Sequence, residues 1–386
     1  MIKHIFSKET QGFCGVRVIG TGICRPGFDI PGRIVSVEEV VQELKNRGVT
    51  DADAAWIKKR TKSETRLYLD PGFATSDLFS VSIEDAIRNS KIDRNELDVG
   101  YLATVTPDWH ASPPMLPTVS YKLGISTKFH GLIKPMFGGD IALACSSFGA
   151  ALHSTVNALM VGCGGKAFVA GADTMERITD PYDKKTWPIF GSLGAAWILE
   201  ACPWEESNFF PKGFYAGNMG EKFARIIYKA GGSKEPLTEA SLRARQHFIY
   251  MEGQEVFNEV IELVISNDVK NNNTIVDQAL IRAGLVLSDI DFVGLHQANG
   301  RMNSQIEERL RYRGFAGSIY NNFSKYANTT SAAIPSVVHE ANVLNILKPG
   351  MTFMFLVFGG GYTWYVVIGR WSKLNQNQVY VPVVGV

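Results

Sequence analysis

The sequence predicts an α/β protein made of two related halves packed against each other. The chain has 386 residues, more than the length of about 250–300 residues at which a single core stops growing. Two kinds of segment occur twice, once in each half, with the same order of helix, turn and apolar strand. Helices that alternate with short apolar strands are typical of mixed or parallel sheets covered by helices.

The first repeated segment runs from the end of a helix into a β-rich stretch. It spans Ser90–Ala103 in one half and Ala283–Leu295 in the other. A polar cluster follows each strand, Thr106–Asp108 in the first half and His296–Asn299 in the second. Functional residues concentrate on loops at the ends of strands, so both clusters are candidates for a site.

The second repeated segment is a helix followed by a turn and a buried strand. Residues 146–172 have this pattern in the first half, and residues 331–359 have it in the second. The apolar stretch Met351–Gly369 is about long enough to cross a bilayer. Gly359–Gly361 interrupt it, and we therefore expect two strands joined by a loop.

We place the boundary between the halves after residue 205, which gives a first half of residues 1–205 and a second half of residues 206–386. The apolar periodicity breaks at Cys202–Asn208. The tract from Asn208 to Arg245 is rich in aromatic residues, glycine and lysine. We expect it to be an insertion that shapes a substrate pocket.

The composition argues against several classes of function. With 39 Lys and Arg against 38 Asp and Glu, the net charge is +1, and no run of like charge calls for nucleic acid or a membrane as partner. The five cysteines include no CxxC pair, which argues against a disulfide framework or a zinc knuckle and favours the cytoplasm. The first nine residues are too polar for a signal peptide. Fingerprints for NAD, ATP and metal binding are missing from the sequence.

Cys145 lies where an apolar run ends and a small-residue helix begins. A strand that ends there delivers the sulfur to the edge of a sheet, and the N-terminus of the next helix lowers the pKa of the thiol and favours thiolate. Taken alone, a cysteine in this position is more often a buried, inert side chain. The case for catalysis depends on three segments of the second half.

These three segments carry groups suited to the same chemistry. His296 ends a β-rich run, Asn328 precedes a helix, and Gly359–Gly361 separate two apolar runs. Each has a structural alternative: a buried histidine, an N-cap asparagine and a tight hairpin. Glycines also let backbone N–H groups face a developing oxyanion.

In order, spacing and local sequence, the segments resemble the active-site motifs of the β-ketoacyl-acyl-carrier-protein synthase III family of the thiolase superfamily. The resemblance covers nearly the whole chain. It implies a thiolase-like fold, with two pseudo-duplicated halves in a five-layered αβαβα arrangement. The motifs that carry it are Val18–Gly22, Trp56–Thr61, Ala144–Ser146, Met251–Phe257, His296–Asn299, Asn328–Ala333 and Phe358–Trp364.

The resemblance implies a role for each catalytic residue. Cys145 attacks an acyl thioester and holds the acyl group, while the N–H groups of Cys145 and Gly360 stabilise the oxyanion. His296 and Asn328 donate hydrogen bonds to the thioester carbonyl of a malonyl-type extender, which loses carbon dioxide and attacks the acyl-cysteine. Superfamily members with a carboxylate base deprotonate an acetyl group instead, so Asn328 favours decarboxylative condensation or plain acyl transfer.

The same resemblance implies residues that bind coenzyme A, its pantetheine arm or an acyl carrier protein: Trp56, Arg60, Arg177, Asn299, Arg301 and Phe358. Tryptophan can stack on adenine and arginine can meet phosphate. The structural alternatives are a core tryptophan and solvated arginines. The resemblance implies no metal and no cofactor besides these thioester substrates, and it implies a homodimer.

The chain departs from the family pattern at positions that bear on acyl length and donor. Arg60–Ser63 replaces Arg-Thr-Gly-Ile, Phe190–Ala195 lacks an Asp, and Trp109–Pro114 forms a longer pocket-capping segment. Residues 126–139 and 205–245 add sequence between the motifs. These differences favour a task other than the simple start of fatty-acid synthesis.

The leading hypothesis is a homodimeric condensing enzyme. It acts on an acyl thioester and a malonyl-type or β-ketoacyl thioester in fatty-acid-like, polyketide or specialised lipid synthesis. A second hypothesis keeps Cys145 but passes the acyl group to an alcohol or an amine. A third is a supporting subunit of a heterodimeric synthase, against which the intact set of Cys145, His296 and Asn328 argues.

Overall fold

The computed structural model describes residues 14–110, 112–125, 128–129, 132–133, 135–268, 270 and 273–375. The N-terminal segment that is too polar for a signal peptide lies outside the described residues. So do Ala111 of the pocket-capping segment and part of the added sequence between residues 126 and 139. Among the described residues, no helix is both long enough and apolar enough to cross a membrane.

Two five-stranded sheets are built on the same plan. The first has the order β1 (Gly15–Cys24), β9 (Ser192–Cys202), β8 (Lys166–Thr174), β4 (Val99–Ala103) and β7 (Phe137–Ile141). The second has the order β10 (Phe209–Asn218), β16 (Thr363–Arg370), β15 (Thr352–Gly359), β13 (Phe292–Leu295) and β14 (Ser318–Tyr320). In each sheet the first three strands pair antiparallel and the last three pair parallel.

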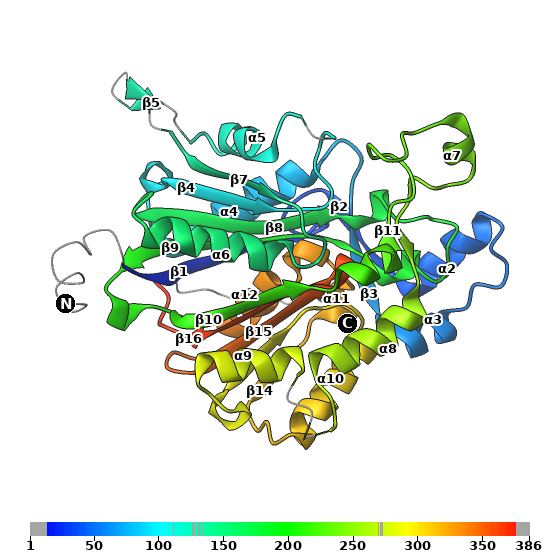
Figure 1. The fold of residues 1–386 in the computed structure, drawn as a ribbon. Helices are drawn as coiled ribbons and strands as arrows, with labels where there is room; N and C mark the ends of the chain where they lie inside the picture. The colour runs from blue at the N-terminus through cyan, green and yellow to red at the C-terminus, as the bar shows by residue number, and fades with distance from the viewer. Residues whose placement is uncertain are drawn as a thin grey trace.

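Helices cover both sheets and fill the space between them, which gives the expected five-layered αβαβα arrangement (Figure 1). The first sheet is covered outside by α4 (Thr75–Ser90) and α5 (Met115–Lys122). Between the sheets lie α6 (Ser147–Met160) and α12 (Ala333–Val343). The second sheet is covered outside by α8 (Gly253–Val264), α9 (Ile275–Ala283) and α10 (Gly300–Tyr312).

The alternation of side chains along the strands explains the layers. On β8, Ala167 and Val169 pack with the central helices, whereas Phe168 and Ala170 pack with the outer ones. Successive side chains of a strand point to opposite faces of its sheet. A strand that is apolar on both faces must be covered on both sides, which is why these strands appear in the sequence as continuous apolar runs.

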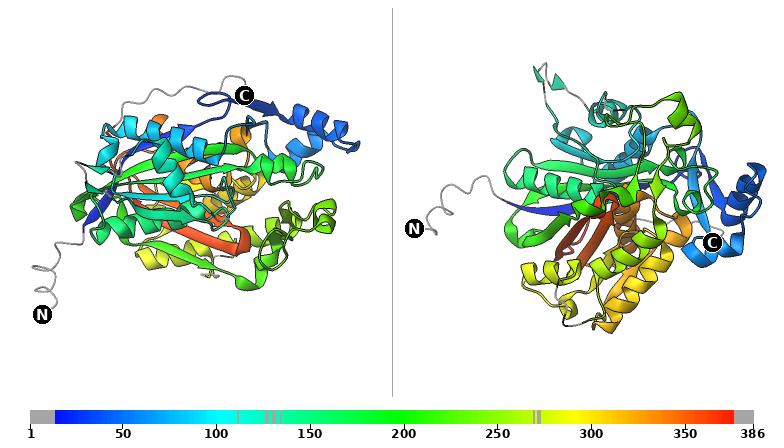
Figure 2. Two further views of the ribbon diagram at one scale, coloured as in Figure 1. Left: turned by 90° about the horizontal axis from the view of Figure 1, so that it is seen from above. Right: turned by 45° about the vertical axis from the view of Figure 1, so that its right-hand side comes forward.

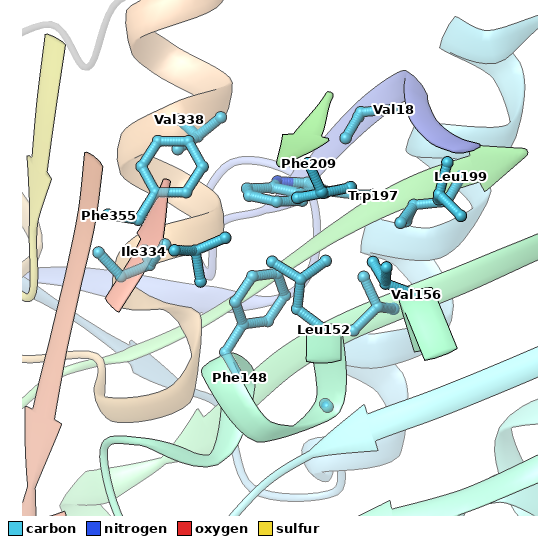
Figure 3. Close-up of a cluster of buried hydrophobic side chains, with 14 of the residues drawn as sticks. Val18, Phe148, Leu152, Val156, Trp197, Leu199, Phe209, Ile334, Val338 and Phe355 are labelled. Atoms are coloured by element: carbon cyan, nitrogen blue, oxygen red, sulfur yellow. The ribbon is translucent and has the colours of Figure 1, made fainter. Parts of the chain in front are cut away.

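The central layer packs around Trp197, which is fully buried (Figure 3). Its ring meets Phe148 of α6 edge-on, with 5.0 Å between ring centroids, and lies 5.9 Å from the ring of Phe355 on β15. Its Nε1 donates to the carbonyl of Pro335 at 3.3 Å. Truncating an aromatic side chain in such a core costs about 3–5 kcal/mol. The cluster joins the two sheets and holds them in a fixed relation.

Smaller units flank the layers. At one end of the molecule, drawn in blue in Figure 2, β2 (Gly32–Ser36) pairs with β3 (Thr65–Leu69) beside α2 (Val37–Asn46) and α3 (Ala54–Thr61). Between β10 and α8 in sequence, β11 (Ile226–Ile227) pairs with β12 (Tyr250–Met251), and α7 (Glu239–Arg243) lies between these two strands in sequence. The remaining short elements are β5 (Lys128–Phe129), β6 (Leu132–Ile133) and α11 (Phe323–Tyr326).

Both repeated segments are confirmed. A short 3-10 turn links α4 to β4, and another links α9 to β13. The helix α6 precedes β8, and α12 precedes β15. The interrupted apolar stretch forms β15 and β16 with a turn at Gly360–Tyr362, as expected. The last strand of the first half ends at Cys202 and the first strand of the second begins at Phe209.

Candidate active site

Cys145 lies directly before α6, in a tight turn that follows β7. Ala144 has a left-handed backbone with φ +48°, which is uncommon for a residue with a side chain and marks a constrained turn. Ser147, the first residue of α6, accepts a hydrogen bond from the N–H of Leu143 at 2.7 Å. The turn thus presents the sulfur at the N-terminal end of α6.

The backbone that faces Cys145 across the site must be glycine. A Cβ on Gly359 would lie 2.7 Å from the nitrogen of Cys145, too close for any real side chain. The next residue, Gly360, turns its backbone N–H toward the Cys145 sulfur, and the N–H of Cys145 does the same. These are the two N–H groups of the predicted oxyanion hole.

Burial raises the pKa of the Cys145 thiol to about 12, and the negative charge of Asp173 acts in the same direction. The N–H groups of Cys145 and Gly360 and the side-chain amide of Asn328 lower this pKa, but less strongly. The expectation that the helix N-terminus favours the thiolate is therefore wrong for the resting protein. Removing water from a thiolate costs more free energy than these hydrogen bonds supply, so Cys145 is a thiol at rest.

His296 follows β13, and its imidazole lines the same pocket as Cys145. The backbone N–H of His296 donates to the carbonyl of Leu356 at 2.8 Å, and the ring meets Phe358 edge-on at 5.3 Å between centroids. Both ring nitrogens are buried without a hydrogen-bond partner among the described residues. Burial lowers the pKa of His296 to about 3, so the ring is neutral at pH 7 and can donate one hydrogen bond to a ligand.

Asn328 is not an N-cap, because the N-cap of α12 is Ala332. The side-chain oxygen of Asn328 accepts from the N–H of Thr330 at 2.9 Å. Its nitrogen donates to the carbonyl of Ala298 at 3.4 Å and also reaches the Cys145 sulfur. Thr330 has φ +52°, an outlier for a β-branched residue. This strained turn fixes which end of the amide faces the thiol.

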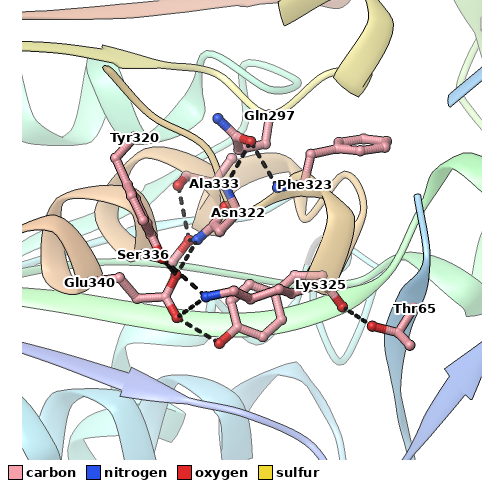
Figure 4. Close-up of polar contacts among 10 residues, drawn as sticks. Thr65, Gln297, Tyr320, Asn322, Phe323, Lys325, Ala333, Ser336 and Glu340 are labelled. Atoms are coloured by element: carbon pink, nitrogen blue, oxygen red, sulfur yellow. Dashed lines mark hydrogen bonds and ion pairs between the residues drawn. The ribbon is translucent and has the colours of Figure 1, made fainter. Parts of the chain in front are cut away.

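A buried polar network joins the segments that carry His296 and Asn328 (Figure 4). The side-chain oxygen of Gln297 accepts from the N–H of Asn322 at 3.2 Å and from that of the next residue at 2.9 Å. Asn322 in turn donates through Nδ2 to Glu340 of α12 at 3.1 Å. Gln297 directly follows His296, and the segment that begins at Asn322 leads to Asn328. The network therefore holds the side chains of His296 and Asn328 at a fixed spacing.

These groups open into one large pocket of about 2040 Å³. Its charged lining residues come from β7 at Asp140 and from the segments 56–61, 183–185, 252–255 and 299–301. Residues 107–115 and 226–251 also line it but contribute no Asp, Glu, Lys or Arg to the lining. The prediction that the tract Asn208–Arg245 is an insertion that shapes a pocket is confirmed only for its later part, residues 226–237, which line the pocket. It is wrong for Phe209–Asn218, which form β10 of the second sheet and belong to the duplicated plan. Such a lining suits a ligand with one charged part and one apolar part.

Trp56 lies at the pocket with cations beside its ring. The guanidinium of Arg60 is 5.0 Å and the Nζ of Lys184 is 5.7 Å from the centre of the indole. Arg301 is exposed and lies 5.0 Å over the ring of Phe257. Cations next to aromatic faces suit a phosphate-bearing, planar group.

The other predicted binding residues occupy different positions. Asn299 lines the pocket, but its side chain is the N-cap of α10 and accepts from two N–H groups there at 2.9 and 3.4 Å. Phe358 lines the pocket beside His296. Arg177 is exposed, donates to the carbonyl of Asp70 at 3.2 Å and is not part of the pocket lining.

Two residues at the site were not singled out from the sequence. Asp173 is the penultimate residue of the buried strand β8, and an acidic residue after a run of apolar ones is a detectable signal, because burying a charge is costly. Lys184 lies in a polar loop, where a lysine carries no such signal. No group of three or more His, Cys, Asp or Glu that could hold a metal occurs in the described part of the chain.

Two segments of the chain match one protein family. Residues 139–216 match 3-oxoacyl-[acyl-carrier-protein (ACP)] synthase III, and residues 280–371 match the C-terminal part of the same family. The β-ketoacyl-[acyl-carrier-protein] synthase III of Caldanaerobacter subterraneus is 30% identical over 355 residues, which cover 92% of this chain and 99% of that protein. A β-ketoacyl-[acyl-carrier-protein] synthase III of Streptomyces coelicolor is 32% identical over 350 residues, covering 90% and 96%.

The fold is also similar to solved structures. The 3-oxoacyl-(acyl carrier protein) synthase III of Pseudomonas aeruginosa matches with a TM-score of 0.76 and 25% identity, over 93% of this chain and 99% of that one. A priming β-ketosynthase from a polyketide biosynthetic pathway shares the fold with a TM-score of 0.76 and 20% identity, over 94% and 98%. The likeness therefore extends over both halves.

Proposed function

The chain belongs to the 3-oxoacyl-[acyl-carrier-protein] synthase III family, and we propose that it holds an acyl group on Cys145 and condenses it with a malonyl-type thioester. It is an acyl-transferring condensing enzyme of fatty-acid or polyketide synthesis. One observation carries the assignment of residues: a thiol from the first half shares a pocket with a neutral imidazole and an amide from the second. The imidazole nitrogens have no hydrogen-bond partner in the part of the protein that the structure describes, a costly arrangement unless a ligand supplies one.

The first step transfers the acyl group to Cys145. The sulfur attacks the thioester carbonyl, and the N–H groups of Cys145 and Gly360 stabilise the oxyanion; loss of one such donor typically costs about 2.7–4 kcal/mol. The C–S bond of the donor then breaks, and the thiol proton leaves with the departing coenzyme A or carrier thiol. Because Cys145 is a thiol at rest, this proton transfer accompanies the attack.

The second step forms the carbon–carbon bond. The carbonyl of the malonyl thioester accepts hydrogen bonds from His296 and Asn328, its carboxylate leaves as carbon dioxide, and the released electron pair forms an enolate. Two neutral donors stabilise this developing charge, whereas a carboxylate in their place would repel it. The enolate carbon attacks the acyl-cysteine, the C–S bond to Cys145 breaks, and the thiolate takes up a proton.

In the proposed function, coenzyme A or the phosphopantetheine arm of a carrier protein enters the pocket past Trp56. The charged residues that line this part of the pocket support this entrance. Arg60, Lys184 and Arg301 supply positive charge for its phosphates. The uncharged lining of residues 107–115 and 226–251 receives the acyl chain. Neither step requires a metal or a further cofactor.

A homodimer is supported by the free edge of the first sheet. β7 is an edge strand, and Phe137 on it is 48% exposed. An unpaired edge is a template for pairing with a second chain, so two copies of β7 can join their sheets. Gel filtration with light scattering tests this, and a monomer would contradict it. A cytoplasmic location is supported by five free cysteines, since reducing compartments keep thiols unpaired.

Two half-reactions test the function. Radiolabelled acyl-coenzyme A is expected to label the wild-type protein but not Cys145→Ala. Labelled malonyl-coenzyme A is then expected to release labelled carbon dioxide in a reaction that requires His296 and Asn328. Labelling without carbon dioxide release would favour acyl transfer to an alcohol or amine, and an unlabelled wild-type protein would overturn the proposal.

A further inference from the structure

Asp173 lies where the two halves of the molecule meet. It is fully buried at the end of β8. Its Oδ1 accepts from the N–H of Val105 at 2.7 Å and from the hydroxyls of Thr104 and Thr106 at 2.9 and 3.0 Å. Its Oδ2 accepts from the N–H of Ser331 at 2.9 Å. One carboxylate thus joins the loop after β4 to the turn before α12.

The contact with Ser331 reaches the active site through Thr330. The left-handed backbone of Thr330 is a conformation that persists only when surrounding contacts hold it, and its N–H donates to the oxygen of Asn328. On the same side, a Cβ on Gly171 would lie 2.1 Å from the carbonyl oxygen of Ser331. The end of β8 is therefore the surface on which the Asn328–Ser331 turn rests.

The position requires a carboxylate rather than an amide. The backbone N–H groups of Val105 and Ser331 approach different oxygens of Asp173. An amide has one oxygen, so Asp173→Asn turns its NH₂ group against one of these two donors. Hydrogen bonds from Val105, Ser331 and Thr104 lower the pKa of Asp173 and so favour its ionised form, although burial acts more strongly in the opposite direction.

Activation of the nucleophile does not explain this buried carboxylate. The charge of Asp173 raises the pKa of Cys145 and so disfavours the thiolate. Among the described residues, Asp173 has no Lys, Arg or His in an ion pair, and its partners are the hydroxyl and backbone donors already named. What the group contributes to the site is therefore geometry.

We propose that Asp173 is a positioning residue for the condensation step, which acts through Asn328 by holding the Asn328–Ser331 turn against β8. The inference rests on the proposed function, because it concerns the hydrogen bond from Asn328 to the malonyl thioester. Acyl loading depends on the N–H groups of Cys145 and Gly360, to which Asp173 makes no hydrogen bond, and on the pKa of Cys145. Loss of the Asp173 charge lowers this pKa and a displaced Asn328 amide raises it, so the two effects on acyl loading oppose each other. Loss of the carboxylate therefore affects the two half-reactions unequally.

A double-mutant cycle of Asp173→Asn and Asn328→Ala tests the proposal on the full chain. Acylation of Cys145 by acyl-coenzyme A is followed by intact mass, and carbon dioxide release is followed from malonyl-coenzyme A. Asp173→Asn is expected to slow carbon dioxide release about 30-fold and acylation less than about threefold. In the Asn328→Ala background the same change is expected to slow carbon dioxide release less than about threefold, because residues that act through one another are not additive.

Asp85→Asn is the matched control. Asp85 is a half-buried carboxylate on α4 that accepts from the N–H of Ile23 at 3.1 Å, and it does not line the pocket. Its replacement is expected to leave the ratio of the two half-reactions unchanged. If Asp173→Asn does not fold, Thr104→Val removes the hydroxyl that donates to the carboxylate and also accepts from the N–H of Thr106. This variant is expected to give the same imbalance, reduced to about threefold.

Equal losses in both half-reactions, or additive losses in the cycle, would overturn the positioning role. Both wild-type half-reactions are measured first. A failure of the proposed function then shows in the wild-type protein, whereas a failure of the positioning role shows only in the variants.

Discussion

The two halves have the same strand order and equivalent helices, yet they contribute different chemistry. In the first half β8 ends near Asp173, and the turn before α6 carries Cys145. In the second half β15 ends at Gly359, and the turn before α12 carries Asn328. The halves also meet reciprocally, since the end of β15 lies against Cys145 and the end of β8 lies against Ser331. A duplicated fold thus brings two equivalent turns to one point, and in the proposed mechanism their sequences divide the roles of nucleophile and donor.

The largest effect is expected at the covalent step. In the proposed mechanism, only the turn before α6 in the first half carries a nucleophile. Cys145→Ala is expected to reduce acyl loading by several orders of magnitude, as loss of the nucleophile does in other enzymes with a covalent intermediate. Intact mass after incubation with acyl-coenzyme A measures it. Cys163→Ala, which removes an exposed free thiol, is the control and is expected to load normally. An acyl group found on the Cys145→Ala protein would show that the division of roles is wrong.

The pH dependence of the reactivity of Cys145 tests the turn before α6 in a second way. With a pKa of about 12 for Cys145, the proton is held more tightly than in an ordinary thiol of pKa about 8.5, so the thiolate fraction at pH 8 is about 10³-fold lower. Alkylation of Cys145 by iodoacetamide is expected to rise about tenfold per pH unit between pH 7 and 10. Peptide mass spectrometry follows the rate, with a small-molecule thiol in parallel. A plateau below pH 9 would mean that the helix end outweighs burial.

The donors of the second half are tested next. Asn328→Asp exchanges an amide donor for a charge that repels the enolate, and it is expected to slow carbon dioxide release from malonyl-coenzyme A by about 10²–10³-fold while acyl loading persists. Because the pKa of His296 is about 3, this ring stays neutral and adds no titration between pH 6 and 8 to the wild-type profile. Loss of acyl loading in Asn328→Asp would mean that the two turns do not have separate tasks.

The sequence predicts the layers for a physical reason and the proposed catalytic residues through a family resemblance. Strands such as β8 and β15 are buried on both faces, so they appear as apolar runs whose repetition reveals the duplication. His296 and Asn328 are recognised instead from the order and spacing of motifs that resemble the synthase III family, because each of them alone has a structural alternative. The residue types and their order along the chain are enough for these predictions, which require no knowledge of distances between residues in the folded protein.

What the sequence could not predict depends on three-dimensional balance. The pKa of Cys145 is decided by burial and by the charge of Asp173 against hydrogen bonds from its own N–H and from two residues more than 180 positions away. The helix argument alone could not weigh burial, which prevails. Asn328 precedes a helix but does not cap it. The cation beside Trp56 in addition to Arg60 is Lys184, whereas Arg177 is turned to Asp70. Side-chain placement around an entrance follows no periodic pattern, and a motif alone does not fix it.

Two glycines give a matched test of the reciprocal contacts. A Cβ on Gly359 would meet the nitrogen of Cys145 at 2.7 Å, and a Cβ on Gly171 would meet the carbonyl of Ser331 at 2.1 Å. Overpacking of this kind costs about 1–3 kcal/mol, so the disturbed half-reaction is expected to slow about tenfold. Gly359→Ala is expected to slow acyl loading more, and Gly171→Ala to slow carbon dioxide release more.

The control for this pair is Gly165→Ala, whose nearest contact would be an ordinary 3.8 Å. It is expected to change neither half-reaction. If Gly359→Ala and Gly171→Ala slow the same half-reaction, the reciprocal contacts do not divide the roles of the halves, and the comparison would hold only for the catalytic side chains themselves.

The smallest effect is expected at the entrance, where the first half supplies Trp56 and Lys184 and the second supplies Arg301. A cation at the surface contributes about 0.2–1 kcal/mol to an ion pair, and the half-buried Lys184 is already paired with Asp51. Lys184→Ala is therefore expected to raise KM for acyl-coenzyme A by a few-fold at most and to leave kcat unchanged. Salt is expected to shrink the difference, because exposed charges are screened over about 8 Å at physiological ionic strength. Arg177→Ala is the matched comparison, since family resemblance assigns Arg177 to coenzyme A while the structure leaves it outside the pocket lining. An unchanged KM in Arg177→Ala would show that Arg177 does not bind coenzyme A, as its position outside the pocket lining indicates. A rise as large as that of Lys184→Ala would mean that the ligand draws Arg177 to the entrance, as the family resemblance implies.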